Sequence, residues 1–540
     1  MSSSHDFQLR RGASDRAWLV VGLVVLAAGV LRHVELPGLY MDAVNPEYLV
    51  VHSLRPALHN PVWTIPSKVF PILGNLYHGV QNYYLGLPFF ALFGTSLTAV
   101  RVFHGLFGAV LVVLVHRLLS RTPLPAWACG LTTTALAADA AFVASLRTQY
   151  VIILGGTAWA LLSVELLLQH RAESTPGPAR RSRLVLSGVC FGLAVYGYFV
   201  LGFLGPALVA LIVAHRGDLP ARNALMRWGS GVLLGLVPYA AGYGSWWIEL
   251  GSFRAFLQSL SSGVRSLQPF RPEGVIERIH GVLHLAHLAW SNLGAELLIL
   301  GGQAEAFPLA NAKLVILGLL VGLGLLAMLT YQRSCLRAVL FAPALLASYL
   351  AVALVFVPRL WAHHMGAVLP LVYLTVGTSA VGLALPVAQA GIWPGRIAHA
   401  LLGSALVAVV SLNTAHQQRF FSRLSAVGGV GSYSDASSRL ASRAVRDPES
   451  AVYVFPEWGF FMPFAFLTGN RVPYELSCEA PRVRRALTGG HDVVVASWND
   501  ALLGSYAATL ERFGAKRFER EILSRRDGAP AIYLLTASAR

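Results

Sequence analysis

The sequence predicts a polytopic α-helical membrane protein, with about eleven transmembrane helices followed by a small α/β domain outside the membrane. The first observation is composition: hydrophobic residues make up 55% of the 540 residues and charged residues only 13%, with a mean hydropathy of +0.58. Soluble domains carry roughly 25% charged residues, so a soluble enzyme is excluded. The second is the repetition of apolar segments of about 20 residues, the length that crosses a bilayer. The third is a change of pattern near residue 413, where short buried strands alternate with helix.

The predicted spans follow a cytoplasmic N-terminus, residues 1–16. They cover residues 17–34, 99–119, 126–146, 151–168, 184–200, 202–214, 228–247, 312–329, 339–357, 365–385 and 397–412. Arginines gather at every second connection, from Arg10 and Arg11 at the start to Arg396 near the end. Because basic loops favour the cytoplasmic side, we expect a multi-pass protein of the inner (plasma) membrane. Its N-terminus is then cytoplasmic and its C-terminal domain extracytoplasmic.

Residues 17–412 form the predicted transmembrane domain, with two large outer loops at residues 35–98 and 249–311. In the first loop, apolar and polar residues alternate at roughly helical spacing, which predicts short amphipathic helices at the membrane interface. The run Tyr83–Phe93 is too short to cross a bilayer. We expect it to be an interfacial or re-entrant piece.

The second outer loop carries polar side chains along one predicted helix face, namely Glu277, His280, His284 and His287. The outermost members of this row lie about 15 Å apart along a straight helix, so they cannot all bind one metal ion. Two interpretations remain: a two-ligand site at His280 and His284, and an ordinary interfacial face. We favour the second and predict no metal site.

Residues 413–540 form the predicted extracytoplasmic α/β domain. Buried strands are expected at residues 451–455, 493–496 and 532–535, and an amphipathic helix at residues 501–513. The apolar run Trp458–Phe466 either lines the core of this domain or touches the membrane surface.

The most informative stretch is LPGLYMDAVNPEY, residues 36–48, directly after the first span. Glu47 fits the start of a helix, because Asn45 is a suitable cap, Pro46 a suitable first residue and an acid is favoured in the first turn. Asp42 lies before that cap in an apolar context, where neither capping nor the helix dipole accounts for it. Asp42 is therefore the stronger catalytic candidate and Glu47 the weaker one.

Several common chemistries lack their motifs. The chain has no glycine-rich phosphate loop after a strand, no GxSxG nucleophile turn and no HExxH helix. It has no nucleic-acid-binding module, although the net charge is +16, and its four cysteines form no CxxC pair. What remains is chemistry on a substrate that the membrane itself supplies.

The order of features resembles the GT-C superfamily of integral membrane glycosyltransferases. The resemblance rests on the first span, the stretch at residues 36–48, the loop end Gly94–Arg101 (GTSLTAVR) and a basic-ended second span. It continues through Tyr196-Gly197-Tyr198 and returns at residues 359–370, RLWAHHMGAVLP. The most similar branch holds the protein mannosyltransferases that use dolichyl-phosphate-mannose and the bacterial aminoarabinose transferase of lipid A.

This resemblance implies a polyprenyl-phosphate sugar as donor, and the transfer of its hexose or pentose to a lipid, glycan or protein at the outer membrane face. It requires a base near the acceptor, for which Asp42 is the candidate. It also requires cations on the phosphate. Guanidinium groups suit that task, and the arginines at predicted outer membrane ends are Arg101, Arg147 and Arg359. For each of these arginines alone, interfacial snorkelling is an equal explanation.

Three further residues are weaker substrate-binding candidates. His363 and His364 supply hydrogen-bond donors at the same membrane level, and Lys68 is the lone lysine of the first outer loop. No cofactor is implied besides the lipid-linked donor, and metal dependence stays open.

The sequence departs from the family pattern at two places. Family members usually show two adjacent acids where this chain has Asp42-Ala43, and many place an acid in the turn after the third span, where Gln149 stands. Asp139, inside the third span, is a candidate for the second carboxylate. An acid at that depth is costly and is expected to face the protein interior, so a structural hydrogen bond is an equal alternative.

Two other function classes remain. A transporter or lipid flippase is expected to show charged pairs or broken helices near mid-membrane and repeated halves. Only Asp139 is a deep acid and no repeat is evident, so this class is the runner-up. A scaffold without catalysis is the third class, and a carboxylate in a well-placed loop counts against it.

Overall fold

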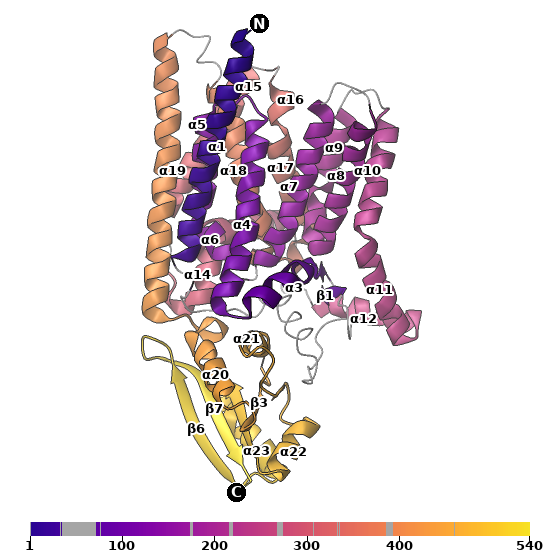
Figure 1. Ribbon diagram of the computed structural model, residues 1–540, viewed down its shortest axis with the longest axis vertical. Coiled ribbons are helices and arrows are strands. Elements are labelled where there is room, and N and C mark those ends of the chain that lie inside the picture. The colour runs from indigo at the N-terminus through magenta and orange to yellow at the C-terminus, as the bar shows by residue number, and fades with distance from the viewer. Residues whose placement is uncertain are drawn as a thin grey trace.

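The computed structural model describes residues 2–32, 34, 72–75, 77–148, 150–172, 177–214, 220–266, 274–305, 307–331, 333, 335–384, 392–457 and 459–539. A helical bundle forms one part of the molecule and a sheet with flanking helices forms the other (Figure 1). The N-terminus and the C-terminal domain lie at opposite ends of the bundle (Figure 1). We call the end of the bundle next to this domain the domain end.

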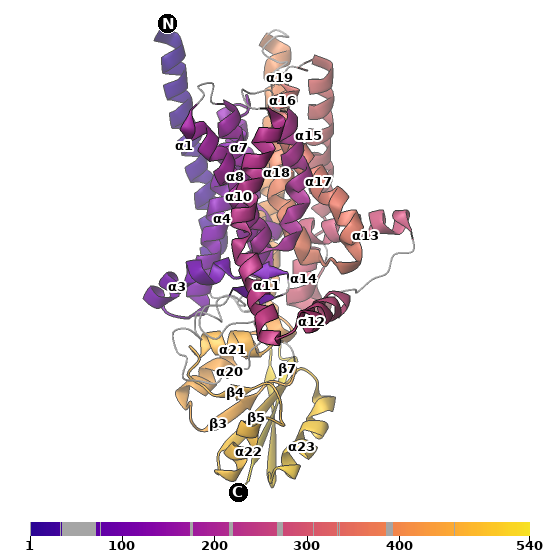
Figure 2. The ribbon, with the colours of Figure 1, turned by 90° about the vertical axis from the view of Figure 1, so that its right-hand side faces the viewer.

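The long helices of the bundle run roughly parallel to its axis, as both views show (Figures 1 and 2). They are α1 (Ser2–Leu31), α4 (Leu97–Ser120), α5 (Ala126–Ala138), α7 (Tyr150–Ala172), α8 (Pro178–Gly197), α9 (Gly205–Ala214), α10 (Ala221–Gly235), α11 (Val237–Leu250), α15 (Ala310–Tyr331), α17 (Phe341–Phe356), α18 (Val368–Ala384) and α19 (Ile392–Val427). Shorter elements join them: β1 (Leu73–Asn75), β2 (His78–Gly79), α3 (Gln81–Phe93), α6 (Ala140–Ser145), η2 (Phe199–Leu204), α12 (Phe253–Ser266), α13 (Val275–Trp290), α14 (Leu293–Leu300), η3 (Gly301–Gln303), α16 (Leu336–Val339), η4 (Val357–Arg359) and η5 (Ala362–Ala367).

Every predicted span falls on a helix or on two consecutive helices of this bundle. Within the described ranges, seven helical segments are long and apolar enough to cross a membrane by themselves. Several predicted spans are instead divided. The seventh changes from α10 to α11 next to Pro238, where a missing N–H interrupts the helical hydrogen bonds. The chain is thus a polytopic α-helical membrane protein.

Helices α8 and α10 approach each other backbone to backbone. Each carries two glycines four residues apart, Gly188 and Gly192 on α8 and Gly231 and Gly235 on α10. A Cβ atom at Gly188 would lie 2.1 Å from the carbonyl oxygen of Trp228, and one at Gly231 would lie equally close to a carbonyl oxygen of α8. Membrane helices use small residues at this spacing to pack closely, so the glycines hold the two helices together.

Replacing Gly231 by alanine is therefore expected to destabilise the protein by about 1–3 kcal/mol, because the added methyl group must push the helices apart. Gly229 on the same helix is the matched control, since a Cβ there meets nothing within 4 Å. Gly229→Ala should stabilise by up to about 1 kcal/mol through helix propensity. Denaturant unfolding of the purified protein in detergent compares them, and two effects of the same sign would contradict the packing argument.

Helix α19 continues beyond residue 412, where the last predicted span ended, to Val427. Two of its polar side chains in that stretch are buried and paired inside the bundle. Asn413 donates to the hydroxyl oxygen of Tyr373 at 2.7 Å, and His416 lies 2.8 Å from the carboxylate of Glu296. Because these polar groups have partners, the helix extends although its hydropathy falls. The predicted domain boundary at residue 413 therefore lies within a continuous helix.

The C-terminal domain is built on a five-stranded sheet of order β4-β3-β5-β7-β6. Strands β4, β3 and β5 are parallel, and β7 and β6 are added antiparallel. Its elements are η7 (Gly431–Tyr433), α20 (Asp435–Arg446), β3 (Ala451–Val454), α21 (Phe461–Leu467), β4 (Tyr474–Glu475), α22 (Pro481–Thr488), β5 (Asp492–Ser497), η8 (Asp500–Leu502), α23 (Leu503–Arg512), β6 (Arg517–Ser524) and β7 (Pro530–Ser538).

The strands and the helix predicted for this domain are confirmed at β3, β5, β7 and α23. Strand β6, RFEREILS, was not predicted from the sequence, because charged residues interrupt its apolar pattern. Charges of this kind are common on edge strands, where they discourage pairing with other chains. β6 is the edge of the sheet.

The apolar run around α21 both fills the domain core and contacts the bundle. Phe461, Phe464 and Phe466 are buried in one cluster with residues of α3 and α4. The rings of Phe466 and Phe90 lie 5.4 Å apart in an edge-to-face arrangement. α3 runs across the domain end (Figure 2), with Leu92 exposed on its outer side. This contact fixes the position of the first turn of α4.

Candidate active site

Four residues singled out in the sequence lie outside the described residues: Asp42, Glu47, Lys68 and Gln149. Their roles stay predictions. The structure does describe the end of α1 that precedes Asp42. A Cβ at Gly105 of α4 would lie 3.1 Å from Val30 of α1, so the two helices pack together near the domain end. Asp42 follows Val34 by eight residues, which span at most about 29 Å.

Arg101 lies in the first turns of α4, placed by the sequence GTS before the helix. Gly94 ends α3 with a positive φ of 73°, a conformation that glycine adopts without strain. Ser96 caps α4 by accepting a hydrogen bond from the backbone N–H of Ala99 at 3.1 Å. The side chain of Arg101 then points into the protein and is only 2% exposed. Snorkelling to the surface is thus excluded for this arginine.

Arg147 lies in the turn between α6 and α7 and is likewise buried, at 5% exposure. Its guanidinium carbon lies 5.2 Å from the ring centroid of Phe421 on α19, a cation–π contact. Burial lowers the pKa of Arg147 well below its usual range, and the nearby charge of Arg101 lowers it further. Two positively charged guanidinium groups are thus buried within range of each other's electrostatic field.

His363 and His364 lie on η5 and are joined through Tyr198. The Tyr198 hydroxyl oxygen lies 2.9 Å from Nε2 of His364 and 3.4 Å from Nε2 of His363. The backbone N–H of Trp361 donates to Nδ1 of His364 at 2.7 Å, and the Tyr349 hydroxyl donates to the His364 carbonyl oxygen. The structure thus brings the two predicted histidines together with Tyr198, whose YGY motif had been noted only for its resemblance.

A third histidine, His78, was not predicted as a site residue. Its ring stacks on that of Tyr198, with centroids 5.6 Å apart, and its Nδ1 donates to the carbonyl oxygen of Gly79 at 3.0 Å. Burial lowers the pKa of His78 to about 4, so this ring is neutral near pH 7. The sequence alone offered no signal for it, because β2 is only two residues long.

Arg359 differs from the other two arginines in its burial. It is half-buried on η4, whereas Arg101 and Arg147 are buried. Its role in phosphate binding stays a prediction.

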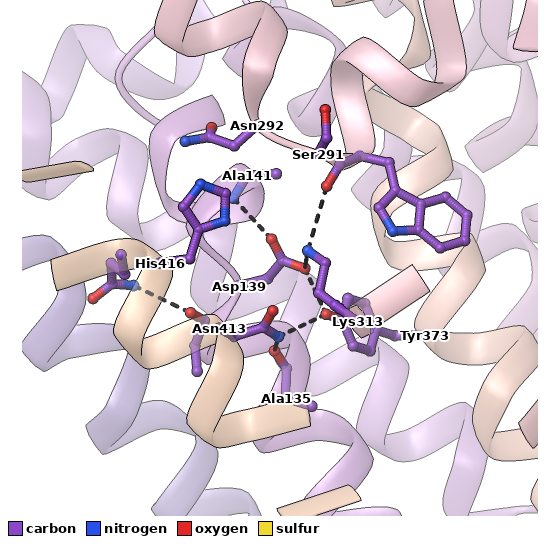
Figure 3. Close-up of polar contacts among 12 residues, drawn as sticks. Ala135, Asp139, Ala141, Ser291, Asn292, Lys313, Tyr373, Asn413 and His416 are labelled. Carbon is purple, nitrogen blue, oxygen red and sulfur yellow. Dashed lines mark hydrogen bonds and ion pairs between the residues drawn. The ribbon is translucent and has the colours of Figure 1, made fainter. Parts of the chain in front are cut away.

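Asp139 is fully engaged in a buried polar network. Lys313 of α15 donates to its Oδ2 at 3.0 Å, and the Tyr373 hydroxyl of α18 donates to the same atom at 2.5 Å. Its Oδ1 caps α6 by accepting from the backbone N–H of Ala141 at 2.8 Å. Figure 3 shows the carboxylate pointing at these donors, with Asn413 beside Tyr373. These contacts favour the structural interpretation of Asp139 over a second catalytic acid.

The network also explains why the third predicted span is broken. Asp139 has an extended ψ of 123°, so α5 ends before it and α6 begins after it. Lys313 was the missed partner, although a lysine within an apolar segment is itself a signal of a buried counter-charge.

The histidines along one face of α13 belong to no group of metal-binding side chains among the described residues. His280, His284 and His287 are all exposed. In the part of the chain that the structure describes, no group of three or more histidine, cysteine, aspartate or glutamate side chains is arranged to hold a metal ion.

Comparisons with known proteins identify solved structures with the same fold as this chain. No protein-family model and no curated protein matches this chain. Among solved structures, ArnT from Cupriavidus metallidurans, bound to undecaprenyl phosphate, matches with a TM-score of 0.59 and 14% identity over 96% of this chain and 98% of that one. The archaeal oligosaccharyltransferase AglB from Archaeoglobus fulgidus, in complex with an inhibitory peptide and a dolichol-phosphate, matches with a TM-score of 0.50 and 12% identity over 97% of this chain and 74% of that one.

Both similarities extend over nearly the whole chain, including the C-terminal domain. At such low identity they establish the arrangement of the helices rather than any residue's role. The chain has the fold of the GT-C membrane glycosyltransferases, as the resemblance in its sequence implied.

Proposed function

We propose that this protein is a glycosyltransferase that moves one sugar from a polyprenyl-phosphate donor to an acceptor at the outer membrane face. The observation that carries the proposal is the buried pair Arg101 and Arg147 at the domain end. Two buried guanidinium groups form a positively charged place, and guanidinium groups bind phosphate oxygens through paired hydrogen bonds. The fold supports the choice of anion, since ArnT of this fold was solved with undecaprenyl phosphate and AglB with a dolichol-phosphate.

The proposed chemistry is a displacement at the anomeric carbon. An acceptor hydroxyl or amine attacks this carbon, the bond to the phosphate oxygen breaks, and the lipid phosphate leaves as an anion. The proton of the acceptor goes to a base, for which Asp42 is the candidate. The leaving phosphate needs no acid, and Arg101 and Arg147 stabilise its charge through bidentate hydrogen bonds. A single displacement inverts the anomeric configuration.

The position of α1 supports Asp42 as this base. Gly105, which α1 packs against, follows Arg101 by four residues, about one helical turn. A chain of eight residues from the end of α1 is long enough to bring the Asp42 carboxylate beside the two arginines. Glu47 and Lys68 follow in the same segment, as a second acid and a further cation for the phosphate.

Arg147→Gln is expected to weaken binding of undecaprenyl phosphate by about 10- to 150-fold, the effect of losing a charged hydrogen bond. The measurement is equilibrium binding to the purified protein in lipid nanodiscs. Arg222→Gln is the control, because Arg222 is exposed on α10, among the arginines predicted to be cytoplasmic. Equal binding by Arg147→Gln and the unaltered protein would contradict the phosphate site.

The proposed function itself is tested by transfer. Membranes holding the protein are supplied with undecaprenyl phosphate carrying labelled mannose, glucose, arabinose or aminoarabinose, together with a membrane extract as the source of acceptor. Label leaving one donor and appearing in an extractable product supports the transferase. Binding of every donor without release of sugar in any extract counts against it.

A transporter or lipid flippase is the alternative, and one observation favours it: Asp139 and Lys313 form a buried charged pair. All atoms of the Asp139 carboxylate are nevertheless satisfied by helix and side-chain donors. Movement of labelled undecaprenyl phosphate across reconstituted vesicles without sugar transfer would favour this alternative.

A further inference from the structure

The hydrogen bonds around His364 have a fixed direction. The backbone N–H of Trp361 can only donate, so Nδ1 of His364 is the acceptor at 2.7 Å. A neutral imidazole has one N–H, and in His364 it must therefore be on Nε2. That N–H donates to the hydroxyl oxygen of Tyr198 at 2.9 Å.

The same donor-to-acceptor order extends from Tyr198 to His363. The Tyr198 hydroxyl has one proton to donate, and Nε2 of His363 lies 3.4 Å from its oxygen. When the Tyr198 proton is directed at Nε2 of His363, that nitrogen is the acceptor and the proton of the neutral His363 ring is on Nδ1. That Nδ1 is buried and has no hydrogen-bond partner among the described residues. The chain of bonds thus ends in a neutral N–H donor that lacks an acceptor.

A second buried donor lies beside it. The ring of Tyr150 contacts that of His363 edge to face, with centroids 6.3 Å apart. Tyr150 is 1% exposed, and its hydroxyl likewise has no partner within the described ranges. Most buried polar groups in native proteins are hydrogen-bonded, so the buried Nδ1 of His363 points to a ligand with an oxygen acceptor.

The position of these donors suggests which part of a ligand they meet. Tyr150 begins α7 three residues after Arg147, which lies in the turn before that helix. In a polyprenyl-phosphate sugar the sugar ring is joined directly to the phosphate. A phosphate held at Arg101 and Arg147 therefore places its sugar within reach of the neighbouring donors, and neutral donors suit the neutral hydroxyl groups of a sugar.

We propose that Nδ1–H of His363 donates to a sugar hydroxyl of the lipid-linked substrate, and that Tyr198 and His364 are positioning residues that keep His363 in this tautomer. The proposal rests on the proposed function and names the part of the site that distinguishes one sugar from another.

The test compares two kinds of ligand. Purified protein in nanodiscs is titrated with undecaprenyl phosphate alone and with undecaprenyl phosphate carrying mannose, glucose, arabinose or aminoarabinose. For the sugar that the unaltered protein prefers, His363→Phe should lose about 5- to 100-fold in affinity, the effect of a lost buried hydrogen bond. Its affinity for undecaprenyl phosphate alone should change less than twofold, because the guanidinium groups are intact.

Three further variants separate positioning from packing. His363→Asn keeps an N–H close to the place of Nδ1 and should recover most of the sugar preference. Tyr198→Phe removes the donor to Nε2 of His363 and should lower that preference about 2- to 10-fold, again without an effect on undecaprenyl phosphate alone. His280→Phe alters an exposed histidine of α13 and should bind every ligand as the unaltered protein does.

The outcomes are distinguishable. Equal losses for the bare and the sugar-bearing lipid in His363→Phe would overturn the inference and indicate a structural histidine, leaving the proposed function in place. Equal binding of all five lipids by the unaltered protein would also overturn it. If the unaltered protein bound none of them, the proposed function would fail and this inference with it.

Discussion

Replacing Asp42 by asparagine is expected to lower sugar transfer by about 10²- to 10⁴-fold, the usual contribution of a general base. Asparagine has the same size but accepts no proton at neutral pH, so the acceptor hydroxyl is not activated. Binding of the donor should be retained, because the proposed grip on the phosphate lies with Arg101 and Arg147. The measurement is the initial rate of transfer from the donor that the unaltered protein uses, at saturating concentration.

Two comparisons make this result specific. Thermal unfolding and undecaprenyl phosphate binding must match those of the unaltered protein, which excludes a folding defect. Glu47→Gln, assayed in parallel, separates the two acids: if Glu47 is a helix-start acid, the change costs about 0.3–1 kcal/mol of stability and little rate. A well-folded Asp42→Asn protein with full activity would refute the mechanism.

The second large effect is expected on stability, when the buried ion pair between Asp139 and Lys313 is broken. Asp139→Asn is expected to lower the free energy of unfolding by about 3–5 kcal/mol, because the ammonium group of Lys313 remains buried without its counter-charge. Both side chains are nearly inaccessible, with side-chain exposures of 1% for Asp139 and 3% for Lys313. Denaturant unfolding in detergent, followed by tryptophan fluorescence, measures the change.

The double variant tests the cause. Asp139→Asn combined with Lys313→Met removes both charges, so its loss should be smaller than the sum of the two single losses. Glu305→Gln is the control for an exposed pair, since this carboxylate is 63% exposed beside Arg419 and Arg423, and exposed pairs contribute little to stability. Additive losses in the double variant would show that the two charges do not interact.

The long helices of the bundle followed from local chemistry. Hydropathy locates them, because the bilayer requires about 20 apolar residues per crossing whatever the neighbours are. Strands β3, β5 and β7 were also visible, because buried strands are continuous apolar runs. Edge strand β6 was not, since its pairing partner rather than its own pattern makes it a strand.

The candidate site was likewise only partly predictable from the sequence. Arg101, Arg147, His363 and His364 were predicted as site residues from their residue types and their predicted membrane level. Their contacts with one another and with other residues were not predicted. The partner of His364 is Tyr198, 166 positions away in the chain, and no periodicity connects residues so distant.

By itself, the sequence determined that this is a polytopic membrane protein with a C-terminal α/β domain. This follows from interactions of each segment with solvent or lipid. Only the tertiary structure decided that Asp139 binds Lys313, that the glycines of α8 and α10 face each other and that His363 ends a directed chain of hydrogen bonds. These are contacts between distant segments, and their geometry depends on how all the helices pack together.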